Sequence, residues 1–365
     1  MCLPENQDIK VSVVMPIYNA YDYLRPAIDS VLTGTLKEIE IICVDDGSTD
    51  HSLDILKEYQ AADPRVRIIT ESNAGPAVAR NKGLSRARGE FVIFLDADDF
   101  YHPTLLEKLY NLAVEKNLDI SVADYDIFNS RKSRFERNIP AEHADIFKGD
   151  EVVSKSTYPD EIFQCVSNYV WNKMFRRSFL TEKGLLFDEE LRVFEDAYFV
   201  MTSLSLASAI GKVNEVLIHH RVYSAQSKNR LFKKYYAQVP LIYERIKAFL
   251  MHNGMYAPLS QSFLNLSASR AYKIYNLLWK DAKEEFWNLY HDSYAESLGW
   301  TAAEPEYFEN PEVRDFCANV LVYTYDQHEK RERQGKKLSL KVVGSKLKIR
   351  ERLRKIKAFF TKSAE

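Results

Sequence analysis

The chain has few cysteines and no motif that would use them. Four cysteines stand far apart among 365 residues, and no two form a Cys-x-x-Cys pair. We therefore expect neither a disulfide framework nor a zinc site. We expect the protein to reside in a reducing compartment. The first ten residues lack the basic and apolar segments of a cleaved signal peptide, and no window approaches 18 uninterrupted apolar residues. The sequence thus predicts a cytoplasmic protein without a membrane span.

Net charge is also nearly absent, at −2, but it is unevenly distributed. Residues 330–362 contain 14 Lys and Arg against two Glu, a net of +12, so the remainder carries about −14. Four apolar residues of this tail recur at helical spacing, namely Ile349, Leu353, Ile356 and Phe360. The pattern is typical of a basic amphipathic helix on an anionic membrane surface. A nucleic-acid patch and a solvated helix are the alternatives; we predict that residues 331–365 contact membrane, not nucleic acid.

Short apolar runs alternate with amphipathic stretches over the first 125 residues, which predicts an α/β fold with a doubly wound, mostly parallel sheet and covering helices. The expected strands are Val11–Pro16, Ile39–Val44, Val66–Thr70, Phe91–Leu95, Ile120–Ala123, Trp171–Phe175 and Val213–His219. The expected helices are Tyr21–Leu32, one capped by Asp50, Pro76–Arg86, Pro103–Asn117, Asp196–Ala207 and a long stretch from Phe232 to about Trp287. Residues 126–165 are polar and aperiodic, so we expect them to leave the sheet.

An acidic motif, Asp96-Ala97-Asp98-Asp99, directly follows the apolar run Phe91–Leu95. Carboxylates at the mouth of a buried strand repel one another unless positive charge is bound there. Mg²⁺ and Mn²⁺ prefer oxygen ligands and commonly share a few carboxylates with substrate phosphates. The motif therefore indicates a divalent-metal site, with a solvated acidic turn as the alternative.

Three further motifs precede the acidic one: Pro16-Ile17-Tyr18-Asn19, then Val44-Asp45-Asp46-Gly47-Ser48-Thr49-Asp50, then Asn73-Ala74-Gly75 to Ala79-Arg80-Asn81-Lys82-Gly83. In this order and spacing, the four motifs resemble those of the family 2 glycosyltransferases of GT-A fold. The resemblance covers residues 9–125 closely and extends loosely to about 227. It implies a glycosyltransferase domain at 1–230, with a nucleotide-sugar half at about 9–125 and an acceptor half at about 126–230. A helical C-terminal region (231–330) and the tail would follow.

The resemblance implies a nucleoside-diphosphate sugar donor, most commonly a UDP-sugar, and carries residue roles with it. Asp45 would accept hydrogen bonds from the base. Ordinary turn or cap roles are the alternatives for Asp46 and Ser48, and a surface position is the alternative for Arg80. The implied nucleotide-binding residues are Pro16, Tyr18, Asn19, Asp45, Asp46, Ser48, Asn73, Gly75, Arg80, Asp96 and Ala97.

Metal and base roles follow from the same resemblance. Asp98 would ligate Mn²⁺ or Mg²⁺ at the diphosphate, and Asp96 would contact the ribose or the metal's hydration shell. One of His219 and His220 would complete the metal shell, because adjacent strand residues point to opposite faces. Which histidine does so is open, as is a structural role for both. Arg221 would meet the pyrophosphate.

A base is also needed, because an acceptor hydroxyl loses its proton as it attacks the anomeric carbon. Glu195 and Asp196 resemble the family's Glu-Asp pair before a helix, and Asp196 is the expected base of an inverting transfer. A favourable charge at a helix start is the alternative reading of both residues.

The chain lacks the Gln-x-x-Arg-Trp motif and spanning helices of processive relatives. We therefore predict a non-processive hexosyl- or N-acetylhexosaminyltransferase acting on a glycan or lipid-linked glycan acceptor. Bacterial capsule, lipopolysaccharide or other surface polysaccharide synthesis is the implied setting, at the inner face of the cell membrane. A catalytically silent nucleotide- or glycan-binding scaffold is one alternative. A sugar nucleotidyltransferase is the other, disfavoured because Pro16–Tyr21 contains no glycine.

Overall fold

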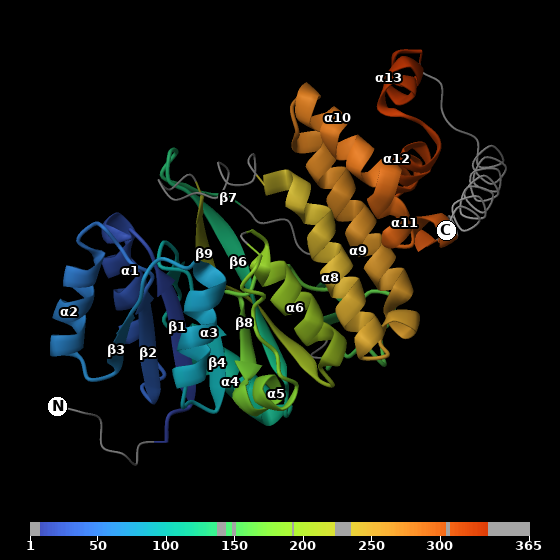
Figure 1. The fold of residues 1–365 in the computed structure, drawn as a ribbon. Helices are drawn as coiled ribbons and strands as arrows, with labels where there is room; N and C mark the ends of the chain where they lie inside the picture. The colour runs from blue at the N-terminus through green and yellow to red at the C-terminus, as the bar shows by residue number, and fades with distance from the viewer. Residues whose placement is uncertain are drawn as a thin grey trace, which may run out of the picture. The chain divides into compact units, whose positions relative to one another are not determined.

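The computed structural model describes residues 8–136, 144–147, 151–191, 193–222, 235–303 and 307–334. The chain divides into two compact units, Met1–Arg230 and Leu231–Glu365. The first is α/β and the second is helical (Figure 1). Among the described residues, no helix combines the length and apolarity needed to cross a bilayer. The predicted amphipathic helix in the tail lies outside the described residues.

The first unit is built on one mixed sheet. Its strands are β1 (Val11–Ile17), β2 (Ile39–Asp45), β3 (Val66–Thr70), β4 (Phe91–Phe94), β5 (Phe100–Tyr101), β6 (Ile120–Asn129), β7 (Arg134–Glu136), β8 (Lys173–Arg176) and β9 (Ile210–Val222). Their order is β3-β2-β1-β4-β8-β6-β9-β5, with β7 paired to β6. Strands β1 to β4 are parallel, β8 is antiparallel to β4 and β6, and β9 runs parallel to β6. The predicted α/β class is confirmed.

Helices cover both faces of this sheet. They are α1 (Tyr21–Leu32), α2 (Ser52–Ala62), α3 (Pro76–Arg86), α4 (Leu105–Glu115), α5 (Arg177–Glu182) and α6 (Glu195–Leu206), with a single 3-10 turn at Ala144–Phe147. Helices α1, α2 and α4 bury the face that carries Val13, whereas α3 packs on the face of Ile42 and α6 on Phe94. Figure 1 shows α3 and α6 on the same side of the sheet. Gly83 permits this approach, because a Cβ there would lie 2.3 Å from a methyl carbon of Val14.

Most elements predicted for the first 125 residues are confirmed to within two residues. Two other predictions, one there and one for residues 126–165, are corrected. His51, not Asp50, is the N-cap residue of α2, although Asp50 still accepts a hydrogen bond from the Ser52 amide at 2.9 Å. The prediction that residues 126–165 leave the sheet is wrong at its start. Strand β6 continues to Asn129 and turns back into β7, because its residues keep pairing with β9.

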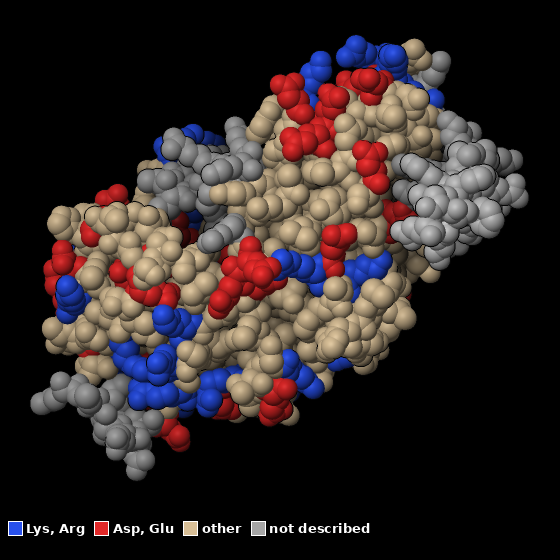
Figure 2. Space-filling view, in the orientation of Figure 1, with Lys and Arg blue, Asp and Glu red and all other residues tan. Residues whose placement is uncertain are grey.

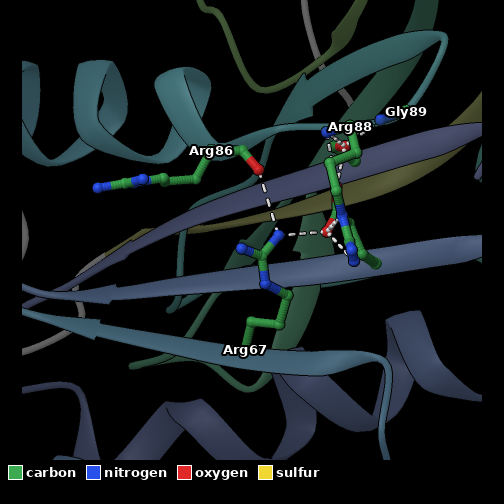
Figure 3. Close-up of polar contacts among 6 residues, drawn as sticks. Arg67, Arg86, Arg88 and Gly89 are labelled. Atoms are coloured by element: carbon green, nitrogen blue, oxygen red, sulfur yellow. Dashed lines mark hydrogen bonds and ion pairs between the residues drawn. The ribbon is translucent and has the colours of Figure 1, made fainter. Parts of the chain in front are cut away.

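A buried carboxylate ties the amino-terminal ends of the strands together. Glu40 is fully buried and accepts hydrogen bonds from Ser12 Oγ at 2.7 Å, Arg67 Nη1 at 2.6 Å and Arg88 Nη2 at 3.0 Å. Figure 3 shows Arg67 and Arg88 reaching the same carboxylate while the Arg86 side chain points away. Burial raises the pKa of Glu40, but these hydrogen bonds outweigh it and hold the pKa below its usual value. Figure 2 shows basic side chains gathered over this end of the sheet.

The second unit consists of α8 (Val239–His252), α9 (Tyr256–Leu277), α10 (Lys280–Leu289), α11 (Ala295–Ser297), α12 (Pro311–Val322) and α13 (Tyr325–Arg333). Short turns of 3-10 or π helix lie at Tyr236–Gln238, Tyr290–Tyr294 and Trp300–Ala302. The predicted helical stretch is thus three helices, and the chain turns between α8 and α9 at Gly254, whose φ is +68°. Aromatic rings fill the core of this unit, for example Tyr290 stacked on Trp300 at 5.0 Å.

Candidate active site

The loops after β1 and β2 leave the same edge of the sheet, because the two strands are parallel neighbours. Asn19, in a left-handed conformation with φ of 50°, accepts a hydrogen bond from the Thr49 amide at 2.8 Å through Oδ1. Its own amide donates to Ser48 Oγ at 3.1 Å. Asn19 and Ser48 therefore fasten one loop to the other. Their predicted contact with a nucleotide stays a prediction.

Asp46 organises the next loop along this edge. Its two carboxylate oxygens accept hydrogen bonds from the amides of Ala74 and Gly75, at 2.7 and 2.9 Å. Its carbonyl accepts a hydrogen bond from Asn73 Nδ2 at 3.1 Å. Gly47 is required beside it, because φ is +70° and a Cβ would lie 2.8 Å from the Asn73 amide nitrogen. Asp46 thus positions the Asn73–Gly75 loop.

Asp45 differs from its neighbour. It ends β2, is 3% exposed, and its Oδ1 has no hydrogen-bond partner among the described residues. A buried carboxylate oxygen without a donor is costly, so such an oxygen marks a place for a donor from outside the protein. Tyr18, also predicted in the nucleotide site, directly follows the neighbouring strand and is 47% exposed. Pro16, predicted in the same site, is partly buried.

Arg80 lies at the centre of the site. It is 2% exposed, so the alternative of a surface arginine is wrong. Its Nη1 donates to Glu195 Oε1 at 2.8 Å and its Nη2 to Asp96 Oδ1 at 2.9 Å. Burial lowers the pKa of the guanidinium, but Asp96 and Glu195 more than offset it and hold the pKa above its usual value. Arg80 therefore joins α3, the acidic motif and the start of α6; its predicted nucleotide contact stays a prediction.

The acidic motif brings three carboxylates together. Asp96, Asp98 and Asp99 each place an oxygen within 4.8 Å of the others, with Ala97 buried between them. An all-oxygen donor set of this kind fits a hard divalent cation such as Mg²⁺ or Mn²⁺. Asp99 is 1% exposed, with His220 and the Arg221 amide at its carboxylate, whereas Asp96 and Asp98 are only partly buried.

The two histidines lie on opposite faces of β9, as alternation requires. His220 Nδ1 lies 3.1 Å from both oxygens of Asp99, whereas His219 Nδ1 lies 2.7 Å from Asp126 Oδ1. Burial lowers the pKa of His220, but Asp99 more than offsets it and holds the pKa above its usual value. His220 is therefore the histidine on the acidic side. In the part of the chain that the structure describes, neither histidine belongs to the group of candidate metal ligands.

Arg221 is held at the same place. Its amide donates to Asp99 Oδ1 at 2.7 Å, and its Nε donates to the Asp98 carbonyl at 2.8 Å. The guanidinium also lies over the rings of Tyr23 and Phe128, 5.1 and 5.2 Å from their centroids. The Arg221 guanidinium thus lies at the acidic motif, where it is suitably placed for a phosphate. Its contact with the pyrophosphate stays a prediction.

Glu195 and Asp196 open α6. Phe194, the N-cap residue, is left-handed with φ of 57°, a strained conformation for a non-glycine residue of the kind that clusters at functional sites. Glu195 is 2% exposed and binds Arg80, so it positions other groups. Asp196 is 7% exposed, and its Oδ1 accepts a hydrogen bond from the Ala197 amide at 2.9 Å. Its charge also acts on Arg80. The base role of Asp196 stays a prediction.

A cluster of rings supports His220, and sequence reasoning missed it. Trp171 stacks on His220 at 4.9 Å and 20°, and on Tyr169 at 4.8 Å and 16°, while Tyr169 and His220 lie 5.9 Å apart. Tyr125 meets Trp171 edge-on at 4.7 Å. Nothing in the spacing of these residues indicates the stack, because they come from two strands and a loop.

Acidic strand ends on a mixed sheet of this topology place the protein among the GT-A glycosyltransferases. Residues 12–182 match the family model described as glycosyl transferase family 2. EpsH of Bacillus subtilis, whose name describes a glycosyltransferase, is 32% identical over 247 residues, which cover 67% of this chain and 70% of EpsH. The chain therefore belongs to the family 2 glycosyltransferases.

Further relatives share part of the chain. The cholesterol galactosyltransferase of Borreliella burgdorferi is 35% identical over 211 residues, 56% of this chain and 58% of that protein. Among solved structures, residues 1–349 of S. aureus TarS in complex with UDP-GlcNAc superpose with a TM-score of 0.71 at 22% identity. That likeness covers 90% of this chain and 92% of TarS 1–349, and it shows a shared fold that extends past the first unit.

Proposed function

We propose that this chain is a metal-dependent, inverting, non-processive glycosyltransferase that moves one sugar from a UDP-sugar to a glycan acceptor. The observation that carries the proposal is the Arg80 network. One buried guanidinium joins Asp96, in the acidic motif, to Glu195. Glu195 directly precedes Asp196, the proposed base. Donor-binding and proton-accepting groups are thereby held on one rigid support.

The donor would bind along the loops at the ends of β1, β2 and β4. The open, buried oxygen of Asp45 is suited to accept a hydrogen bond from the N–H of a uracil ring. Asp98 and Asp96 would hold the divalent cation, which supplies neutralisation of the negative charge that develops on the departing diphosphate. Arg221, fixed at the Asp98 carbonyl, would meet the same diphosphate.

The acceptor hydroxyl would react in a single displacement. Asp196 accepts the hydroxyl proton while the hydroxyl oxygen forms a bond to the anomeric carbon. The bond between that carbon and the diphosphate oxygen breaks, and UDP leaves with the bonding electron pair. Attack opposite the leaving group inverts the anomeric configuration. The Ala197 amide, which donates to Asp196 Oδ1, fixes the orientation of the carboxylate.

The name of one further relative supports an acceptor rich in hydroxyl groups. One relative is a poly(ribitol-phosphate) beta-glucosyltransferase of Bacillus spizizenii, 32% identical over 209 residues, 55% of this chain and 30% of that protein. We propose that this chain likewise serves the synthesis of a bacterial surface polysaccharide. The net charge of +12 in residues 330–362 supports contact with an anionic membrane surface on the cytoplasmic side.

The test is release of nucleotide from a panel of UDP-, GDP-, CMP- and dTDP-sugars, with and without Mn²⁺. We expect Mn²⁺-dependent release from a UDP-sugar and from none of the other classes. Release without metal would contradict the metal proposal, and release from another nucleotide class would contradict the uracil contact. Binding of UDP-sugars without turnover, even with extracted surface glycans as acceptors, would support the silent scaffold.

A further inference from the structure

Lys173, the first residue of β8, is a buried cation with only neutral acceptors in hydrogen-bond contact. Its side chain is fully buried. Its Nζ donates to the carbonyls of Ser167 and Tyr169, both at 2.7 Å, and to Asn172 Oδ1 at 2.8 Å. All three donor positions of the ammonium are therefore used, and all three go to one short segment, residues 167–172.

That segment carries two rings of the cluster beside His220, those of Tyr169 and Trp171. The Tyr169 carbonyl is held by Lys173, while the Tyr169 ring stacks on Trp171 and Trp171 stacks on His220. Asn172, the third acceptor, also donates to the Ala123 carbonyl of β6 at 2.9 Å. Lys173 thus fixes the backbone that carries these rings, and Asn172 ties this backbone to the sheet.

We propose that Lys173 is a positioning residue for sugar transfer, which holds the 167–172 segment and its rings in place beside His220. The inference rests on the proposed function, in which the acidic motif next to His220 takes part in binding the donor. Lys173 touches neither donor nor acceptor in this role. It acts through the backbone of the 167–172 segment.

The test compares Lys173→Met, which keeps the length of the side chain but loses charge and donors, with Lys173→Arg, which keeps the charge. Lys155→Met is the matched control. Lys155 Nζ also donates to two backbone carbonyls, those of Leu206 and Ala207 at 3.0 and 3.2 Å, but at the far end of α6 from Asp196. The assay measures kcat and KM across pH with the UDP-sugar that the wild type turns over in Mn²⁺. UDP binding by calorimetry and urea unfolding accompany it.

For Lys173→Met we expect UDP affinity and donor KM within about twofold of wild type and kcat at least about tenfold lower. Lys173→Arg keeps the charge and the donors and should recover part of the lost kcat, but not all of it, because a guanidinium cannot repeat the three-acceptor geometry. Lys155→Met should leave kcat unchanged.

A wild-type kcat in Lys173→Met would overturn the proposal. Should Lys173→Met not fold, Lys173→Arg decides, and an unchanged kcat in that variant refutes it. An equal loss in Lys155→Met would assign the effect to general loosening of α6 and overturn the specific role. Failure of the proposed function is a separate outcome, since it appears as absent turnover in the wild type.

Discussion

Replacing Arg80 by Met should be the most damaging single substitution at the site. The change removes the guanidinium but keeps most of the volume of the side chain. It leaves Glu195, 2% exposed, and Asp96, whose side chain is 16% exposed, without the cation that each now binds. Removing one partner of a buried ion pair typically costs about 3–5 kcal/mol, because the remaining charge stays out of water.

Most of this destabilisation should come from the stranded charge of Glu195, and a smaller part from that of Asp96. Glu195 lies within the first turn of α6 with a side chain that is 2% exposed, whereas the side chain of Asp96 keeps 16% of its surface exposed. We therefore expect a loss of about 4 kcal/mol in the free energy of unfolding. Adding Glu195→Met should restore at least about 2 kcal/mol, because the stranded carboxylate is then gone.

Urea unfolding of the wild type, the two single variants and the double variant gives the coupling energy directly. Arg25→Met is the control, since Arg25 pairs with Glu58 on the surface, where the side chains are 49% and 61% exposed. It should leave the urea midpoint close to that of the wild type. A loss below about 1 kcal/mol in Arg80→Met, or strict additivity in the double variant, would refute the reasoning.

Three further outcomes are expected. Asp98→Ala should lower Mn²⁺-dependent UDP release at least about 100-fold with an unchanged urea midpoint, because the carboxylate lies in a loop outside the core. Asp196→Asn should keep UDP binding by calorimetry and lower transfer about 10²- to 10⁴-fold; equal loss of both would contradict its role as base. Glu40→Gln should lower stability by about 2 kcal/mol at pH 7. The pKa of Glu40 in the folded protein lies below its usual value. The stability difference between wild type and Glu40→Gln should therefore be constant above about pH 5 and vanish as the pH falls through the folded pKa. A stability difference that grows in acid would disprove this prediction.

Local patterns were enough to predict the nucleotide half of the sheet. Apolar runs such as Phe91–Leu95 have few alternatives to a buried strand, and Pro76 marks the first turn of a helix at a position that the structure keeps. Strands β5 and β7 have two and three residues, too few for any period to show. The end of β6 was missed because Asp124 and Asp126 interrupt its apolar pattern and most of its last residues are only half-buried, held by pairing with β9.

The choice between the two histidines depended on strand register, which no single segment contains. Alternation along β9 required that only one of them face the acidic motif. The structure pairs Phe100 of β5 with His219, so the preceding Asp99 meets His220. A shift of one residue in that pairing would exchange the two roles. The Arg80–Glu195 contact was equally out of reach, because 115 residues separate its partners.

The buried polar groups of the site fall into two kinds, and the difference carries the functional argument. Asp46 and Glu195 are bound by amides or a guanidinium of the protein itself, so they hold loops and helices in place whether or not a substrate is present. Asp45 keeps an oxygen that nothing in the described chain binds. A buried acceptor without a donor destabilises the empty protein, so a ligand that supplies a donor at Asp45 recovers that cost on binding. Asp45 ends β2 and is paired with Ile17 and Thr70 of the neighbouring strands, so a donor that reaches it meets an acceptor already in position.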